Sequence, residues 1–106
     1  QKVHTWNGDL TLLNEFDVTQ PSSLSQGVFC DSEYIYFVRS HAGGATFSEL
    51  RIYDWNGQLK FQVDMPEWNS WSPEPEGINV IDGKIYVIAR QNGITVYEIV
   101  LKEKEA

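Results

Sequence analysis

The chain has 106 residues, 42% of them apolar, and its 8 Lys and Arg against 15 Asp and Glu give a formal net charge of −7. This length normally forms one domain with its own core, and the apolar fraction is too high for a disordered segment. Nucleic-acid binders need clustered Lys and Arg to neutralise phosphates, whereas here the basic residues are scattered and outnumbered. No apolar run approaches the roughly 20 residues that span a bilayer. We therefore expect neither nucleic-acid binding nor membrane insertion.

The start of the chain and its cysteine content give two further expectations. The sequence opens with Gln1 in place of an initiator methionine, and no signal peptide precedes the patterned sequence, so we expect a trimmed, cleaved or excerpted chain. Cys30 is the single cysteine, which excludes an intramolecular disulfide. Because Cys30 lies in an apolar run, we expect a buried and inert thiol.

Patterns typical of β-strands run through the whole chain, and no segment shows the 3.6-residue period of an amphipathic helix. Two strands are expected in residues 1–18, followed by strands at 28–31, 34–40, 49–55, 58–65, 78–81, 84–90 and 94–101. Asp-Gly and Asn-Gly pairs mark hairpin turns between these runs. They occur at Asp82-Gly83, Asn7-Gly8, Asn56-Gly57 and Asn92-Gly93. The sequence therefore predicts an all-β chain of nine strands.

The chain also repeats itself after 49–50 residues. Trp6-Asn7-Gly8 recurs 49 residues later as Trp55-Asn56-Gly57, and Gly27 recurs 50 residues later as Gly77. A repeat of this length with four short strands is typical of a β-propeller blade. The sequence therefore predicts a partial β-propeller of about two four-stranded antiparallel blades.

The blades divide the chain, which we treat as one propeller fragment, into three parts. Residues 1–18 hold strands c and d of one blade, residues 26–65 form a full blade, and residues 76–101 hold strands a, b and c of the last blade. Such a fragment exposes faces that a closed ring would bury. We therefore expect the remaining blades as partners, supplied by the same parent chain or by identical copies.

The segment 67–76 between the last two blades contains two tryptophans, two prolines and three glutamates. Aromatic faces beside carboxylates are the groups that sugar sites use, and exposed loops carry much of protein function. We therefore nominate Trp68, Trp71, Glu74 and Glu76 as ligand-binding residues. The alternative is that both tryptophans pack between neighbouring blades and that the glutamates are solvated charges.

Polar residues at the strand ends give further candidates. Gln26 and Glu76 precede the repeated glycines, where they would form a polar ring at the channel mouth or bond to the loop of the next blade. Arg39 and Arg90 end the second strand of each blade, where they would face the channel or pair with a nearby acid. His41, in the Gly-rich loop that follows, is expected to be a solvated loop residue.

No pattern indicates a metal or a catalytic centre. The two histidines lie far apart, the cysteine is alone, and no spacing resembles a zinc site or a nucleophile elbow. Four aspartates occupy turn-like positions, where Asp stabilises turns by itself: Asp9, Asp31, Asp54 and Asp82. We therefore expect no cofactor and no enzymatic activity.

Three segments, at residues 25–36, 52–57 and 74–87, resemble the blades of propeller domains in tail and receptor-binding proteins of phages of Gram-positive bacteria. They are also similar to the helveticin-type bacteriocin propellers, in which Gln-Gly or Pro-Glu-Gly opens each blade. The resemblance extends from about Leu24 to Leu101, although those propellers have more blades than this chain supplies. It implies an extracellular or virion module that meets bacterial wall glycopolymers.

The expected function is therefore a non-catalytic binding module for a cell-surface or carbohydrate ligand, within a phage receptor-binding protein or a secreted protein. Three alternatives stay open. The chain would be a structural platform or assembly domain of a virion, or a self-assembling oligomeric lectin. The third is an enzyme whose catalytic residues lie partly on further blades, since a fold alone fixes no chemistry.

Overall fold

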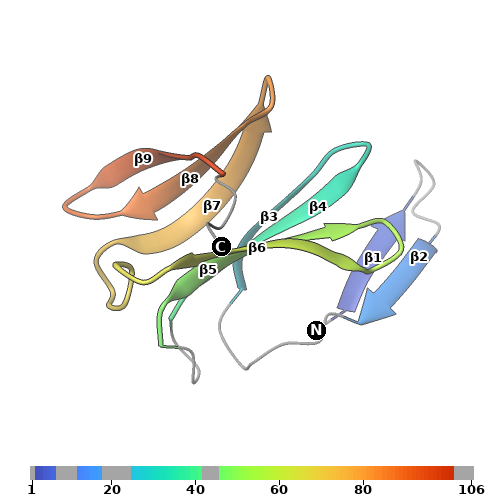
Figure 1. Cartoon of the computed structure of the whole chain (residues 1–106), viewed down its shortest axis with the longest axis horizontal. Helices are drawn as coiled ribbons and strands as arrows, with labels where there is room; N and C mark the ends of the chain where they lie inside the picture. Colours follow the sequence, from blue (N-terminus) through green and yellow to red (C-terminus); the bar gives the residue numbers. More distant parts are fainter. Residues whose placement is uncertain (1, 7–11, 18–24, 42–45, 102–106) are drawn as a thin grey trace, which may run out of the picture.

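The structure is a computed structural model that describes residues 2–6, 12–17, 25–41 and 46–101. Within these ranges the chain is all-β, as predicted, with nine strands and no helix. None of the described segments is therefore a helix that could cross a membrane. The strands form one two-stranded pair and two larger antiparallel sheets, of four and three strands (Figure 1).

Each sheet is a meander in which strands that follow one another in sequence are neighbours. The two-stranded pair consists of β1 (Lys2–Trp6) and β2 (Leu12–Asp17). The four-stranded sheet consists of β3 (Ser25–Cys30), β4 (Tyr34–Arg39), β5 (Ser48–Asp54) and β6 (Leu59–Met65). The three-stranded sheet consists of β7 (Glu74–Ile81), β8 (Lys84–Arg90) and β9 (Ile94–Ile99).

The hairpin turns confirm the reading of the Asp-Gly and Asn-Gly pairs. Asp82 and Gly83 have φ angles of 51° and 76°, and Asn92 and Gly93 have φ angles of 52° and 110°. Asp82-Gly83 forms a two-residue turn between the paired Ile81 and Lys84, which requires positive φ at both positions. The loop at Asn92-Gly93 has three residues between the paired Arg90 and Ile94. Asn56-Gly57 lies in the turn between β5 and β6, where Gly57 has a φ angle of 86°. Asn7-Gly8 lies outside the described residues.

The first strand of each larger sheet begins earlier than the sequence predicted. β3 starts at Ser25 and β7 at Glu74, ahead of the repeated glycines, whereas the prediction began the strands after them. The reason is a β-bulge at each glycine, where the pairing shifts between Ser25 and Gly27 and between Pro75 and Gly77. The bulge lets the strand pass the glycine and continue pairing on its far side.

The first two strands of the two larger sheets have the same pairing register at a constant offset of 50 residues, whereas β9 is offset from β5 by 46 residues. Gly27 pairs with Val38 in the four-stranded sheet, and Gly77 pairs with Ile88 in the three-stranded sheet. The bulge falls at the same place in both. The sequence repeat is therefore a repeat of strand pairing as well as of residue types.

The main core lies between the two larger sheets, which pack face to face. β7 packs on β3 and also on β4, and Figure 1 shows it running beside β3. The four-stranded sheet contributes Tyr36, Val38, Leu50, Ile52 and Met65, and the three-stranded sheet contributes Ile78, Ile85, Val87 and Ala89. Each fully buried Val, Leu or Ile stabilises the fold by about 1.5–3 kcal/mol, so this interface holds the two sheets together.

The closest approach of the two sheets is at the repeated glycines. A Cβ atom built on Gly27 would lie 2.8 Å from the Cα of Gly77, which is closer than real Cβ atoms come to backbone. Any side chain at this position would push the first strands apart. Gly27 is therefore required by packing.

The opposite face of the four-stranded sheet carries a second, smaller core of Ile35, Phe37 and Tyr53, with Trp55 packed against it. Cys30 lies on β3 opposite Ile35 and is exposed, which corrects the expectation of a buried thiol. Side chains alternate between the faces of a strand, and its neighbour Phe29 packs against the main core. Cys30 therefore points away from the three-stranded sheet.

We expect Gly27→Ala to lower the free energy of unfolding by about 1–3 kcal/mol, the usual cost of overpacking. Gly77→Ala is the matched control, because a Cβ there meets only the Cδ1 atom of Ile88 at 3.9 Å. The control should leave the stability of the single chain unchanged or slightly raised. Urea unfolding at high dilution measures both, and equal stability of the two variants would contradict the close contact.

Candidate functional site

The residues nominated from the sequence gather at one end of the stacked sheets. We call it the Arg90 end: β3 and β7 begin there, and β4 and β8 end there. The nominated residues on these strands and on the β6–β7 connection are Gln26, Arg39, Trp68, Trp71, Glu74, Glu76 and Arg90. The sequence repeat predicted that Gln26 and Glu76 lie side by side, whereas Trp68 and Trp71 have no counterpart in the repeat.

Glu74 and Arg90 form an ion pair at this end. They are directly opposed in the β7–β8 ladder, and the Nη2 atom of Arg90 donates to the Oε1 atom of Glu74 at 2.7 Å. Glu74 is buried, whereas the side chain of Arg90 is mostly exposed. The expected pairing of Arg90 with a nearby acid is thereby confirmed, and the guanidinium remains open to solvent on its other side.

Glu76 extends this pair into a group of three charged side chains. A hydrogen bond with Glu74, then partial burial and the charge of Glu74, raise the pKa of Glu76 above its usual value, although Arg90 acts in the opposite direction. Glu76 itself is exposed. The group therefore offers carboxylate acceptors and guanidinium donors side by side, an arrangement that suits hydroxyl groups.

Arg39 occupies a different environment from Arg90. Its residue exposure is only 2%, and burial lowers its pKa while the nearby charge of Glu49, its strand partner, raises it. Glu49 also accepts a hydrogen bond from the Nε atom of Arg51 at 2.9 Å. Arg39 is thus part of a buried charged cluster in the four-stranded sheet and contributes little accessible surface.

Trp68 is placed in the core. Its backbone N–H donates to Met65 at 2.8 Å and its carbonyl accepts from Ser48 at 2.7 Å, which turns the chain back against the start of β5. Its ring packs edge-on against Tyr97 of the other sheet, with a centroid distance of 4.9 Å. This placement matches the alternative in which the tryptophan packs between neighbouring sheets.

Trp71 is the exposed aromatic residue of the Arg90 end, with 52% of its surface accessible. Its ring lies edge-on to the ring of His41, with the centroids 4.7 Å apart. His41 was expected to be a solvated loop residue, but it is half-buried and its ring contacts the ring of Trp71. The rest of that glycine-rich loop, residues 42–45, lies outside the described residues.

Gln26 lies at the same level as Glu76 on the neighbouring first strand. Both directly precede a repeated glycine, and the two glycines are in close contact. Gln26 is half-buried. The two first strands therefore bring an amide and a carboxylate to the same edge of the stack.

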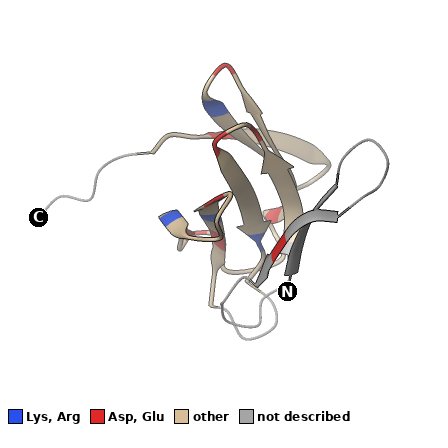
Figure 2. Cartoon of the chain, turned by 90° about the vertical axis from the view of Figure 1, so that its right-hand side faces the viewer, with Lys and Arg blue, Asp and Glu red and all other residues tan. Residues whose placement is uncertain are grey.

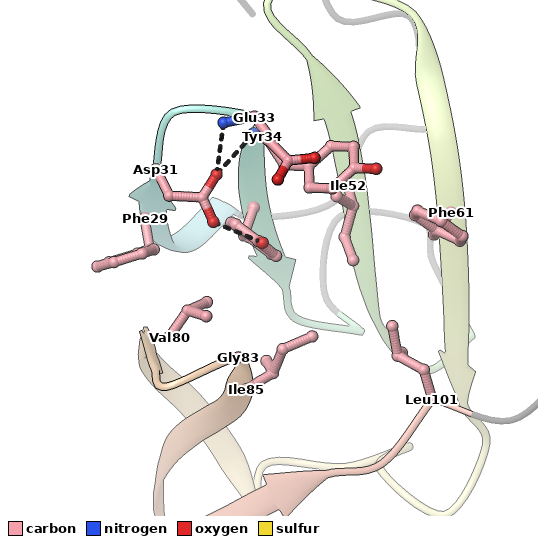
Figure 3. A pocket seen from close by; sticks show the side chains of 11 residues that line it. Phe29, Asp31, Glu33, Tyr34, Ile52, Phe61, Val80, Gly83, Ile85 and Leu101 are labelled. Atoms are coloured by element: carbon pink, nitrogen blue, oxygen red, sulfur yellow. Dashed lines mark hydrogen bonds between the residues drawn. The ribbon is translucent and has the colours of Figure 1, made fainter.

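A cavity that the sequence did not predict lies at the opposite end, which we call the Asp31 end. It has a volume of about 380 Å³ and opens between the two larger sheets (Figure 3). Its walls are mainly aromatic and aliphatic, with two carboxyl groups at the rim, and its lining is Phe29, Asp31, Glu33, Tyr34, Tyr36, Ile52, Phe61, Val80, Gly83, Ile85 and Leu101. The turn position of Asp31 was recognised from the sequence, but a cavity between two sheets depends on how they stack.

Asp31 organises the wall of this cavity. Its Oδ1 atom accepts hydrogen bonds from the backbone N–H groups of Glu33 and Tyr34, both at 2.8 Å, and its Oδ2 atom accepts the Tyr36 hydroxyl at 2.9 Å (Figure 3). Burial opposes ionisation of Asp31, but these hydrogen bonds outweigh it and lower its pKa. Asp31 thus stabilises the β3–β4 turn, as predicted, and its carboxylate is fully engaged by the chain itself.

The charges of the described residues form no basic surface. In Figure 2, the blue and red segments are interspersed along the ribbon. In the described part of the chain, no three His, Cys, Asp or Glu residues come together as a metal would require.

Comparison with protein-family models, with curated proteins and with solved structures finds no match to this chain. The fold and the candidate site therefore rest on the residues and contacts described above.

Tyr36 gives a direct test of the Asp31 cluster. Burial and the hydrogen bond to Asp31 raise its pKa to about 12. The raised pKa contributes stability that is complete below pH 10 and is lost as pH rises through the folded-state value. Tyrosinate absorbance should show a step near pH 12 that Tyr36→Phe removes, and a step there that survives this change would contradict the assignment.

Glu74→Gln tests the charged group at the Arg90 end. The change removes the negative charge of Glu74, which raises the pKa of Glu76, and keeps the positive charge of Arg90, which lowers it. The pKa of Glu76 should therefore fall. Carboxyl NMR titration measures this shift, and Asp64→Asn on β6 is the control that should not alter it. A Glu76 titration that stays unchanged in Glu74→Gln would show that the two carboxyl groups are not coupled.

Proposed function

We propose that this chain is a segment of a β-propeller that acts as a non-catalytic binding module for carbohydrate, within an extracellular or virion protein. The observation that carries the proposal is the exposed Trp71, held by His41 at the Arg90 end, where Glu76 and Arg90 also lie. The ligand would be a glycan of a cell surface, such as a wall glycopolymer.

The propeller part of the proposal is supported by the way the two larger sheets relate to each other. They are antiparallel meanders whose first two strands pair in the same register at an offset of 50 residues, and they stack through their first strands. Blades of a propeller are antiparallel meanders of four strands arranged around an axis. The three-stranded sheet would be such a blade without its fourth strand.

The binding part is supported by the chemistry of the Arg90 end. An indole ring presents an apolar face to the C–H groups of a sugar ring, and carboxylate, amide and guanidinium groups bond its hydroxyls. A chain with a net charge of −7 and scattered basic residues is poorly suited to polyanions. A neutral or N-acetylated sugar fits this combination best.

The proposal assigns no catalysis to this end. Glu74 is buried, and its carboxylate already forms an ion pair with Arg90. A pair of acids that cleaves glycosidic bonds needs both carboxyl groups directed at the substrate. The Glu74–Glu76 pair is therefore proposed to bind hydroxyl groups.

The test is binding of the whole chain to an array of neutral and N-acetylated oligosaccharides. Trp71→Ala should weaken binding about tenfold or more, because it removes the stacking face. The matched control is Phe61→Ala, since Phe61 is 47% exposed but lies in the cavity at the Asp31 end. Loss of binding in Phe61→Ala with retention in Trp71→Ala would move the site to the cavity.

The virion-platform alternative predicts a different result from the same samples. A platform domain would bind no sugar on the array, and Trp71→Ala would instead impair assembly with other virion components. Absence of sugar binding by the unmodified chain would therefore overturn the carbohydrate proposal.

A further inference from the structure

One face of the three-stranded sheet is covered by the main core, and the other is open. The open face carries large aliphatic side chains with high exposure: 53% for Ile81, 73% for Ile94 and 59% for Val96. The exposed polar residues Asn79, Lys84 and Glu98 share this face. Monomeric soluble proteins rarely expose large apolar patches, and such patches usually mark contact sites.

The open face is equivalent, position by position, to a face that is buried elsewhere in the same chain. Ile88 and Val96 are paired across β8 and β9 as Val38 and Leu50 are paired across β4 and β5. Val38 and Leu50 have no exposed surface, because the three-stranded sheet covers them. The open face therefore has the pattern of a surface on which another sheet of this kind packs.

Gly77 supports the same conclusion. Its equivalent, Gly27, is required because Gly77 lies against it, whereas a Cβ on Gly77 would meet only Ile88 Cδ1, at 3.9 Å. Gly77 has no positive φ angle that would call for glycine. No contact among the described residues demands a glycine at this position. A further first strand that crossed Gly77 as β7 crosses Gly27 would demand one.

The chain also presents a surface that matches the open face. β7 reaches the four-stranded sheet through Ile78 and Val80, whose equivalents on β3 are Val28 and Cys30. Val28 is 59% exposed, and Cys30 is exposed on the same side of β3. On the neighbouring β4, Ile35 and Phe37 are already buried within the chain, so the exposed surface that matches the open face lies on β3.

We infer that a second copy of this chain docks head to tail on the open face. Its β3 lies over β7 and β8 of the first copy, with Gly27 of one copy against Gly77 of the other. The contact is heterologous, so repeated copies would add in the same direction and close into a ring if the rotation allows it. This inference rests on the stacking part of the proposed function and is independent of carbohydrate binding.

The first test is the solution mass of the whole chain by light scattering, compared with that of Gly77→Val. The unmodified chain should be an oligomer, and Gly77→Val should shift it to the single-chain mass of 12.2 kDa. The variant should keep its fold, shown by an unchanged far-UV spectrum, since the side chain enters open space within the monomer. A monomeric unmodified chain, or a folded Gly77→Val variant with unchanged mass, would overturn the inference.

The second test locates the contact. Phe29 on β3 and Val80 on β7 line the same cavity between the two sheets of one chain. In the contact between copies, Asn79 of the first copy takes the place of Phe29, and Cys30 of the second copy takes the place of Val80. Asn79→Cys should therefore form a disulfide with Cys30 of another copy when oxidised glutathione accepts the two electrons. Within one chain these residues point away from each other on different sheets, so such a disulfide links two copies.

Two controls separate the possible contacts. Cys30→Ser combined with Asn79→Cys should lose the linked dimer, and a dimer that persists would mean that two open faces meet each other. Sugar binding is measured in parallel on the Gly77→Val chain. An unmodified chain that binds sugar but stays monomeric would overturn only the docking inference, whereas one that assembles but binds no sugar would overturn only the carbohydrate proposal.

Discussion

The contact between β3 and β7 at Gly27 and Gly77 is the constraint on which the rest of the structure depends. It allows the first strands of the two larger sheets to approach so closely that no side chain fits between them. Because the first two strands of both sheets have the same register and the same bulge, this one contact aligns these strands along their length. The main core and the cavity between the sheets follow from this alignment.

The two ends of the stack use their polar groups differently. At the Asp31 end, the carboxylate of Asp31 is satisfied by two backbone N–H groups and the Tyr36 hydroxyl, so its role is to hold a turn and a cavity wall. At the Arg90 end, Arg90 and Glu76 keep exposed surface beside an exposed tryptophan. A ligand therefore meets exposed charged groups beside an exposed aromatic ring at the Arg90 end, which is why the proposed binding function is placed there.

Much of the fold was predictable because it is encoded locally. Asp82-Gly83 and Asn92-Gly93 fix their hairpins by φ preference alone, and the 50-residue repeat aligned Gln26 with Glu76 before any packing was known. The features that were missed depend on tertiary packing. The burial of Trp68, Trp71 and Cys30 depends on which face of a sheet is covered by another sheet. Trp68 enters the core, whereas Trp71 and the thiol of Cys30 stay exposed. The cavity likewise needs the distance between two sheets, which no residue pattern specifies.

The most direct test of this account is an NMR measurement of proton contacts between β3 and β7. The account predicts a strong nuclear Overhauser effect between the Hα protons of Gly27 and Gly77, since a Cβ on Gly27 would lie within 2.8 Å of the Gly77 Cα. It also predicts contacts between the side chains of Phe29 and Val80. Absence of the glycine contact in a chain whose two sheets are otherwise formed would contradict the stacking from which the site and both proposals are derived.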